Sequence, residues 1–314
     1  MLRWRLTMAP VLIGTFVGIC WLDHRAGPRA SYFWGFVALL ALRCAWELGQ
    51  LLRVRSFDLN VPLVQFCTVW VIWSSWVQPP LEILTGDVTS HVKTSVGMTA
   101  FYWARLAPLS HLSFMFAGSV LLLFLSGCVR YREPGKSMES LGAELLIVSY
   151  VGVLLGVTAQ LRWVAGAELG YLALGSLVVA TKCGDIGAYT LGRLFGKRKM
   201  VPSLSPGKTW MGAWGAVLGA TVGSVAWFQF GSQMFAKPGQ IPCEWWCSAL
   251  LGAILGVVGL IGDLAESLIK RDVGAKDAPA LIPGFGGLLD VLDSILYAGP
   301  VAYILWLVLP LAPR

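Results

Sequence analysis

Long apolar segments separated by short charged ones dominate this chain of 314 residues and restrict the folds open to it. Hydrophobic residues make up 56% of the chain, charged residues only 13%, and the mean hydropathy is +0.69. A soluble domain carries about 25% charged residues, so this composition excludes an ordinary soluble protein. The 15 tryptophans suit anchors at a membrane surface. The sequence therefore predicts an all-α, polytopic integral membrane protein.

The apolar segments predict about nine transmembrane helices, judged against roughly 20 residues per crossing. The first segment follows Arg3 and Arg5 and lacks a clear small-residue cleavage site, so we expect an uncleaved first helix. The predicted spans are approximately 9–22, 32–52, 61–77, 111–128, 145–160, 168–182, 211–230, 246–269 and 294–311.

The basic residues predict the orientation of the chain in the membrane. An N-terminus on the inner side places most of them in inner loops: Arg3, Arg5, Arg53, Arg55, Arg130, Arg132, Lys136, Arg193, Lys197, Arg198, Lys199, Lys208, Lys270, Arg271 and Lys276. This agrees with the positive-inside rule. It accounts for the net charge of +7. Nucleic-acid binding is not needed to explain this charge, and no basic-aromatic motif for it is present. We expect a multi-pass protein of a bacterial inner or cell membrane, with residues 267–294 on the cytosolic side.

Residues 267–294 hold a dense set of charges in this otherwise apolar chain, divided by the glycine-rich stretch 283–287. Before that stretch, Asp263, Glu266 and Lys270 are spaced i, i+3 and i+7, which places them on one face of a helix. After it, Asp290 and Asp293 are spaced i, i+3 and also share a face. Carboxylates, cations and glycines together suit the binding of a polyphosphate with its metal ion.

The ligand types favour Mg²⁺, which binds through one or two carboxylates together with substrate phosphates. Lys270, Arg271 and Lys276 can neutralise the phosphate oxygens that the metal does not reach. Gly286 and Gly287 allow the backbone to approach a ligand closely. Zinc is disfavoured, because the seven cysteines form no C-x-x-C pair and the three histidines no cluster. The alternative interpretation is a solvated loop between two membrane helices.

A second polar segment, residues 185–212, lies on the same side of the predicted membrane. Asp185 and Tyr189 are one helical turn apart, and the stretch Ser205-Pro206-Gly207-Lys208-Thr209 resembles a phosphate-binding turn before a helix. The spacing G-x-x-x-x-G-K-[ST] of a P-loop is absent. An ordinary surface turn is the alternative here.

Both segments resemble the signature of the phosphatidate cytidylyltransferase (CDP-diacylglycerol synthase) family. That signature reads S-x-x-K-R, four residues, K-D, then P-G-H-G-G, two residues, D-R-x-D-S. The chain matches it at Ser267, Lys270, Arg271, Lys276, Asp277, Pro283, Gly284, Gly286, Gly287, Asp290, Asp293 and Ser294. Phe285 stands where the family usually has His, and Val291 where it has Arg. The family's S-P-K-K-T-x-E-G turn after a D-x-x-A-Y helix resembles 185–212, with Gly207 and Met211 as departures.

The resemblance implies that CTP and phosphatidate react to give CDP-diacylglycerol and pyrophosphate, with Mg²⁺ as the cofactor. Expected metal ligands are Asp263, Asp290, Asp293 and Asp185; expected catalytic residues are Asp290, Asp293, Lys270 and Lys276. Expected substrate and phosphate contacts are Ser205, Lys208, Thr209, Arg271, Asp277, Gly286 and Gly287. Residues 142–314 would form the catalytic membrane domain, and residues 1–141 variable helices around it. The expected partners are CTP, phosphatidate and membrane lipids, with a homodimer left open.

Two other functions remain open at this point. A CTP-dependent lipid kinase of the dolichol kinase type would use the same nucleotide but release CDP in place of pyrophosphate. A transporter would also place charges within the membrane, although the chain shows no internal repeat of the kind many transporters carry. A CDP-alcohol phosphatidyltransferase is disfavoured, because its D-x-x-D-G-x-x-A-R pattern is absent: Asp293 is followed by Ser294.

Overall fold

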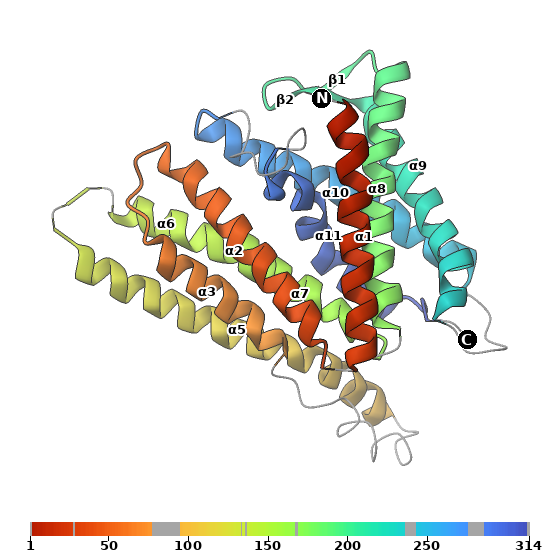
Figure 1. The fold of residues 1–314 in the computed structure, drawn as a ribbon, viewed down its shortest axis with the longest axis horizontal. Helices are drawn as coiled ribbons and strands as arrows, with labels where there is room; N and C mark the ends of the chain where they lie inside the picture. The colour runs from red at the N-terminus through yellow and green to blue at the C-terminus, as the bar shows by residue number, and fades with distance from the viewer. Residues whose placement is uncertain are drawn as a thin grey trace. The chain divides into compact units, whose positions relative to one another are not determined.

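The computed structural model describes residues 2–27, 29–76, 95–132, 134–135, 137–166, 169–235, 243–275 and 286–312 (Figure 1). For residues 2–9 and 95–108 the structure describes the backbone and not the side chains.

The described residues form helices and a two-stranded hairpin, which confirms the predicted all-α class. In the first part of the chain the elements are α1 (Leu2–Ala26), α2 (Ser31–Arg53), α3 (Val61–Trp73), the 3₁₀ turn η1 (Ser74–Trp76), α5 (Ser95–Arg130), α6 (Ser137–Ile147), the π-helical η2 (Val148–Val153), α7 (Leu154–Ala159) and η3 (Gln160–Arg162). They continue with α8 (Gly170–Phe195), β1 (Lys199–Val201), β2 (Ser205–Thr209), α9 (Trp210–Ala226), η4 (Trp227–Gly231), η5 (Ser232–Met234), α10 (Trp245–Asp272) and α11 (Leu288–Val308).

Within the described residues, 6 helical segments are long and apolar enough to cross a membrane: Ser31–Arg53, Leu109–Arg130, Ser137–Arg162, Trp210–Met234, Trp245–Asp272 and Leu288–Val308. The chain is thus an integral membrane protein, but the expected count of nine spans is not confirmed. The three other predicted spans correspond to α1, α3 and α8. The apolar helix Val61–Trp76 is shorter, and α8 carries Lys182, Asp185 and Arg193 among its apolar residues.

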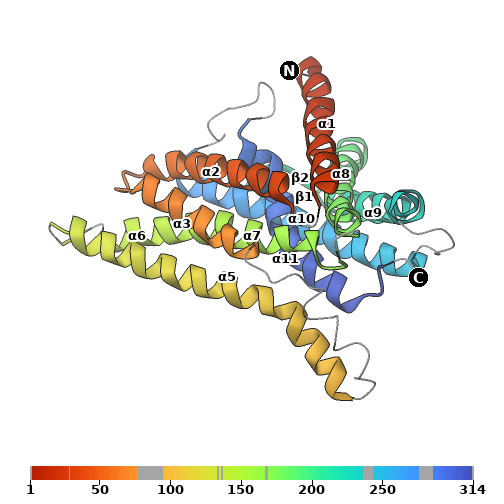
Figure 2. The same ribbon diagram turned by 60° about the horizontal axis from the view of Figure 1, so that its bottom comes forward.

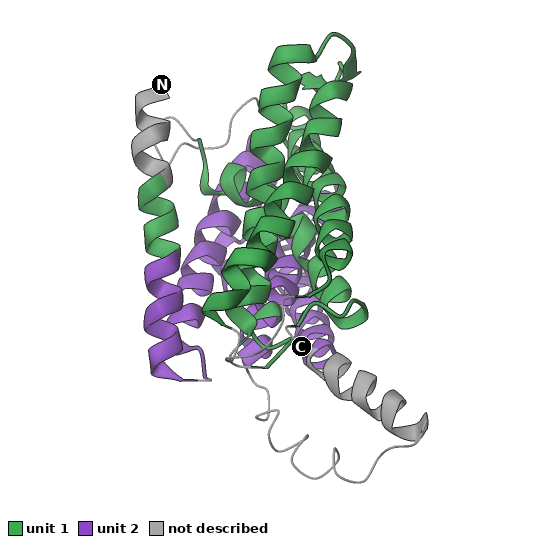
Figure 3. Ribbon diagram, turned by 90° about the vertical axis from the view of Figure 1, so that its right-hand side faces the viewer, with its two compact units in different colours: residues 1–16, 161–314 green, residues 17–160 purple. Residues whose placement is uncertain are grey.

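The chain divides into two compact units (Figure 3). Unit 1 comprises Met1–Phe16 and Leu161–Arg314, and unit 2 comprises Val17–Gln160. This is a division by packing. The predicted functional division between residues 141 and 142 stays a prediction.

In unit 2, helices α2, α3, α5, α6 and α7 run alongside one another (Figures 1 and 2). The fully buried Glu144 of α6 connects several of these elements. Its Oε1 accepts hydrogen bonds from the backbone N–H of Asn60 (2.8 Å) and from Nη2 of Arg130 (2.7 Å). The Asn60 side chain in turn caps α3 by accepting from the N–H of Leu63 (3.3 Å). A buried carboxylate paired in this way holds the α2–α3 loop against α5 and α6.

In unit 1, α8 and α9 meet through glycines, so that their backbones touch. A Cβ atom on Gly215 would lie 2.3 Å from the carbonyl oxygen of Gly187, and one on Gly187 would lie 2.1 Å from that of Gly215. On α10, a Cβ on Gly256 would lie 2.8 Å from the carbonyl oxygen of Ala216 in α9. Small residues spaced along membrane helices permit this close approach. Helix α9 therefore packs against both α8 and α10 at backbone distance.

Helices α10 and α11 approach each other just as closely near the charged residues. A Cβ on Gly262 would lie 2.8 Å from the carbonyl oxygen of Asp293 and 2.7 Å from Cβ of Tyr297. Gly262 is next to Asp263 in the sequence. This glycine therefore lets the first turns of α11 lie directly against the charged end of α10.

The contact between α8 and α9 predicts the effect of adding one methyl group. In a helix interior, Gly→Ala is favourable by about 1 kcal/mol, but overpacking costs about 1–3 kcal/mol. We expect Gly215→Ala to lower the melting temperature of the detergent-purified protein, followed by tryptophan fluorescence. Gly118→Ala in α5 is the matched control, because nothing lies within 4 Å of a Cβ there. A Gly215→Ala protein as stable as the control would contradict this packing.

Candidate active site

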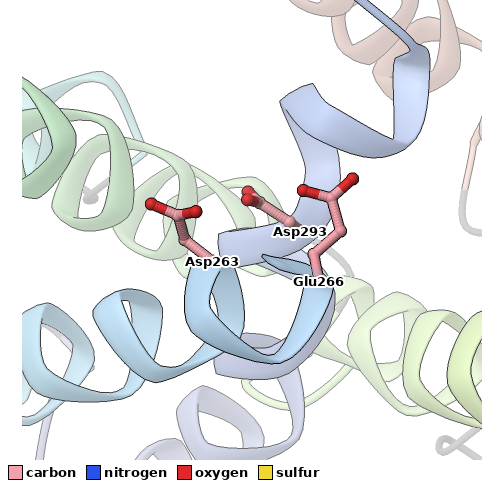
Figure 4. Close-up of side chains that lie close together, drawn as sticks. All are labelled: Asp263, Glu266 and Asp293. Atoms are coloured by element: carbon pink, nitrogen blue, oxygen red, sulfur yellow. The ribbon is translucent and has the colours of Figure 1, made fainter. Parts of the chain in front are cut away.

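Three carboxylates from two helices form an acidic cluster, defined here as Asp263, Glu266 and Asp293. One oxygen of each lies within 4.8 Å of the others. Figure 4 shows Asp263 and Glu266 on consecutive turns of α10, with Asp293 reaching them from α11. Glu266 and Asp293 are only 1% and 6% exposed, whereas Asp263 is partly exposed. Carboxylates held this close repel each other unless a cation or a proton lies between them, so the cluster fits a hard divalent cation.

One oxygen of Glu266 supports this fit. Its Oε2 accepts from Nζ of Lys270 at 3.0 Å, but its Oε1 is buried and has no hydrogen-bond partner among the described residues. A buried carboxylate oxygen without a partner is costly. A cation bound in the cluster would satisfy it.

Two largely buried lysines neutralise part of the acidic charge. Nζ of Lys270 bridges Glu266 and Asp290, at 3.0 Å from Oε2 and 2.7 Å from Oδ1. Nζ of Lys208 lies 2.8 Å from Oδ2 of Asp263. Their side chains are only 14% and 13% exposed. The carboxylates of Asp263, Glu266, Asp290 and Asp293 beside these two ammonium groups leave a formal charge of −2, which one divalent cation would balance.

Asp290 lies beside the acidic cluster and has a structural role that the spacing did not predict. Its Oδ2 accepts from the backbone N–H of Gly287 at 2.9 Å, which caps the start of α11. Gly286 has φ of 89°, and a Cβ there would lie 2.3 Å from Oδ2 of Asp290. Gly286 is thus required by the left-handed backbone and by the carboxylate beside it. In this structure both Asp290 oxygens are engaged by Gly287 and Lys270.

Asp185 lines the same cavity but pairs with a lysine that the sequence analysis did not select. Nζ of Lys182 lies 2.9 Å from Oδ2 of Asp185. The sequence feature that could have identified Lys182 is an ammonium group within an apolar segment, one helical turn before a carboxylate.

Glu266 was recognised as sharing a face with Asp263 and Lys270 but was not assigned to the metal. The same i, i+3 spacing could have included it.

The stretch expected to form a phosphate-binding turn is strand β2, which pairs antiparallel with β1. Helix α9 begins directly after it, as predicted, and Oγ1 of Thr209 caps this helix by accepting from the N–H of Gly212 at 3.1 Å. The side chain of Lys208 reaches Asp263 from this strand. Arg271 at the end of α10 donates through Nε to the carbonyl oxygen of Leu204 at 3.3 Å, which ties α10 to the hairpin.

These groups line one cavity of about 700 Å³, within the 300–1,000 Å³ common for ligand sites. Its wall comes from α8, β1, β2, α9, α10 and α11. The predicted site residues in it are Asp185, Lys208, Thr209, Asp263, Lys270, Asp290 and Asp293, joined by Glu266, Arg193 and Lys199. Ser205, Arg271, Gly286 and Gly287 are not among its lining residues. Lys276, Asp277 and Phe285 lie outside the described residues.

Comparison of the sequence with known proteins identifies the family of this chain. The model of the cytidylyltransferase family matches residues 3–309. A phosphatidate cytidylyltransferase of Mycobacterium bovis is 39% identical over 181 residues, which are 58% of this chain and 54% of the relative. One of Mycobacterium leprae is 40% identical over 137 residues, 44% of this chain and 40% of the relative. One of Brucella suis is 31% identical over 252 residues, 76% of this chain and 87% of the relative.

The chain spans about half the length of the mycobacterial relatives and most of the Brucella relative. The family match covers nearly the whole chain, and it confirms the resemblance that the two motifs indicated. The chain belongs to the cytidylyltransferase family.

Proposed function

We propose that this protein is a phosphatidate cytidylyltransferase, which converts CTP and phosphatidate to CDP-diacylglycerol and pyrophosphate. The observation that carries the proposal is the acidic cluster with its two lysines in one cavity of a membrane protein. Both charge types are needed to hold a polyphosphate with its metal. The family and the names of the relatives support the same reaction.

The donor set suits Mg²⁺, with Asp263, Glu266 and Asp293 as the residues that would hold it. The ion supplies charge neutralisation for the polyphosphate and the leaving pyrophosphate. Asp290 and Asp185, the other predicted ligands, lie on the same cavity wall.

The basic residues of the cavity act on the substrate phosphates. Lys208 and Lys270 provide charge-assisted hydrogen bonds to phosphate oxygens, which are stronger than neutral ones. Arg271, Lys276 and Asp277 extend the predicted substrate site beyond these two lysines. The phosphate group of phosphatidate is an anion near neutral pH and is itself the nucleophile. The reaction therefore needs orientation and charge neutralisation, with neither a covalent intermediate nor a histidine base.

The positive-inside distribution of basic residues favours a site on the cytosolic side, and the bacterial relatives favour a bacterial inner membrane. CTP is available there. Phosphatidate would reach the cavity from the lipid phase, as expected for an integral membrane enzyme.

The proposed activity is tested by incubating the purified full chain with labelled CTP, Mg²⁺ and phosphatidate in detergent micelles. CDP-diacylglycerol and pyrophosphate should form in equal amounts. Release of CDP together with a phosphorylated lipid alcohol would identify a lipid kinase. The absence of any CTP-derived product would contradict the proposal.

Removing one negative charge from the acidic cluster should nearly abolish turnover. We expect Asp293→Asn and Glu266→Gln to lower kcat by more than about 100-fold, since altering even the outer partners of a metal site costs 10–100-fold. Glu139→Gln is the control, because Glu139 is exposed on α6 in unit 2. Rates at several Mg²⁺ concentrations, with monodispersity checked by gel filtration, measure the effect. Near-normal rates in both cluster variants would exclude the assigned ligand set.

The lysines that face the cluster should affect CTP binding. A hydrogen bond to a charged group contributes about 1.5–3 kcal/mol, so Lys208→Ala and Lys270→Ala should each raise the KM for CTP at least about tenfold. Lys197→Ala serves as the control, because Lys197 is exposed next to the hairpin and does not line the cavity. Steady-state rates over a range of CTP concentrations give the comparison. Equal KM values in all three variants would argue against phosphate binding by these lysines.

A further inference from the structure

Lys182 is a charged residue inside α8 that the proposed reaction has not used. A charged side chain within a membrane helix is costly unless it is paired. Nζ of Lys182 lies 2.9 Å from Oδ2 of Asp185, 2.9 Å from the carbonyl oxygen of Val291 and 3.2 Å from Oγ of Ser294. One ammonium group thus joins α8 to the start of α11.

These three contacts distinguish Lys182 from the lysines that line the cavity. An ammonium group has three N–H donors, and the three oxygens account for all of them. Lys208 and Lys270 are among the residues that line the cavity, whereas Lys182 is not, although its neighbours Thr181 and Asp185 are. Lys182 therefore does not line the cavity, and its three donors are already used by these oxygens, although its side chain is 35% exposed.

The partners of Lys182 lie on either side of a cluster carboxylate. Val291 and Ser294 flank Asp293 in the first turns of α11. Gly262 of α10 fixes the same turn from a second side, through its close approach to the carbonyl oxygen of Asp293. The turn that carries Asp293 is thus contacted by two residues, Gly262 of α10 and Lys182 of α8.

We propose that Lys182 is a positioning residue that fixes Asp293 in the acidic cluster and Asp185 on the cavity wall. This inference rests on the proposed function of the cluster as a metal site. Preorganised ligands bind a metal more tightly, because less ordering is left to the moment of binding. Loss of Lys182 frees the start of α11 and the Asp185 carboxylate, and the affinity for a divalent cation falls.

The test measures Mn²⁺ binding to the purified full chain, with free Mn²⁺ quantified by electron paramagnetic resonance. We expect Lys182→Met to weaken Mn²⁺ binding about tenfold or more, as is typical when a partner of a metal ligand is removed. Lys182→Arg retains the charge and should recover part of the affinity. Ser294→Ala removes one acceptor and should weaken binding by a smaller factor than Lys182→Met.

The matched control is Ser176→Ala. Oγ of Ser176 accepts from Nε1 of Trp306 at 3.1 Å, so it also joins α8 to α11, but roughly 9 Å from Lys182 along the helix. Its loss should lower the melting temperature and leave Mn²⁺ affinity unchanged. The comparison separates the positioning of metal ligands from general helix contact.

Several results would overturn the inference. Unchanged Mn²⁺ affinity in Lys182→Met shows a structural role only, and an equal loss in Ser176→Ala shows a general effect of loosening α11. A higher KM for CTP with unchanged Mn²⁺ affinity shows direct nucleotide binding by Lys182. If Lys182→Met does not fold, the other two variants decide. The inference is then overturned if Lys182→Arg and Ser294→Ala both bind Mn²⁺ with the affinity of the wild type. Absence of Mn²⁺ binding by the wild type, with and without CTP, does so as well.

The proposed function and this inference fail separately. If the wild type binds Mn²⁺ but makes no CDP-diacylglycerol, the proposed reaction is wrong, and the Mn²⁺ affinities still decide the role of Lys182. If the wild type makes CDP-diacylglycerol and Lys182→Met binds Mn²⁺ normally, only the positioning role is excluded.

Discussion

The site depends on pairing carboxylates with ammonium groups inside helices that are otherwise apolar. An unpaired charge in such surroundings costs several kcal/mol. Lys208 pairs with Asp263, Lys270 with Glu266 and Asp290, and Lys182 with Asp185. Asp293 has no ion-pair partner among the residues described here. The uncompensated charge is therefore concentrated at Asp293 and at the free oxygen of Glu266, which is where a bound cation would be most stabilising.

The second requirement is geometric, and glycines meet it. Charged residues from different helices can share a cavity only if the helix backbones come close together, and side chains of ordinary size would keep them apart. Gly187 and Gly215 bring α8 and α9 together, and Gly262 brings α10 against α11. Because Gly262 precedes Asp263 and touches the carbonyl group of Asp293, one glycine contact brings two carboxylates of the cluster together.

The sequence was sufficient to predict the helical membrane class, the helix face shared by Asp263, Glu266 and Lys270, and the family. The class and the shared face follow from composition and local spacing, and the family follows from the resemblance of the two motifs to its signature. The cross-helix partners of Lys182 and the capping role of Asp290 could not be predicted, because tertiary packing determines them. Hydropathy placed the start of the last predicted span at residue 294, but α11 begins at Leu288. Its first two turns tolerate two aspartates, because Asp290 caps the helix and Asp293 joins the acidic cluster.

The lysines at and near the cavity are of two kinds, those that line it and one that does not. Lys208 and Lys270 line the cavity and face carboxylates that the proposed metal ion would also face. In the proposed function, the carboxylates would hold the cation of a bound polyphosphate, and the two lysines would neutralise its phosphate oxygens. The ion-paired groups Lys208, Lys270, Asp263 and Asp290 would then each keep an opposite partner, while Asp293 and the free oxygen of Glu266 would gain one. Lys182 would take no part in this exchange, because Asp185, Val291 and Ser294 already accept its three donors. In the proposed site, Lys182 would therefore hold the metal ligands in position, whereas Lys208 and Lys270 would contact the substrate.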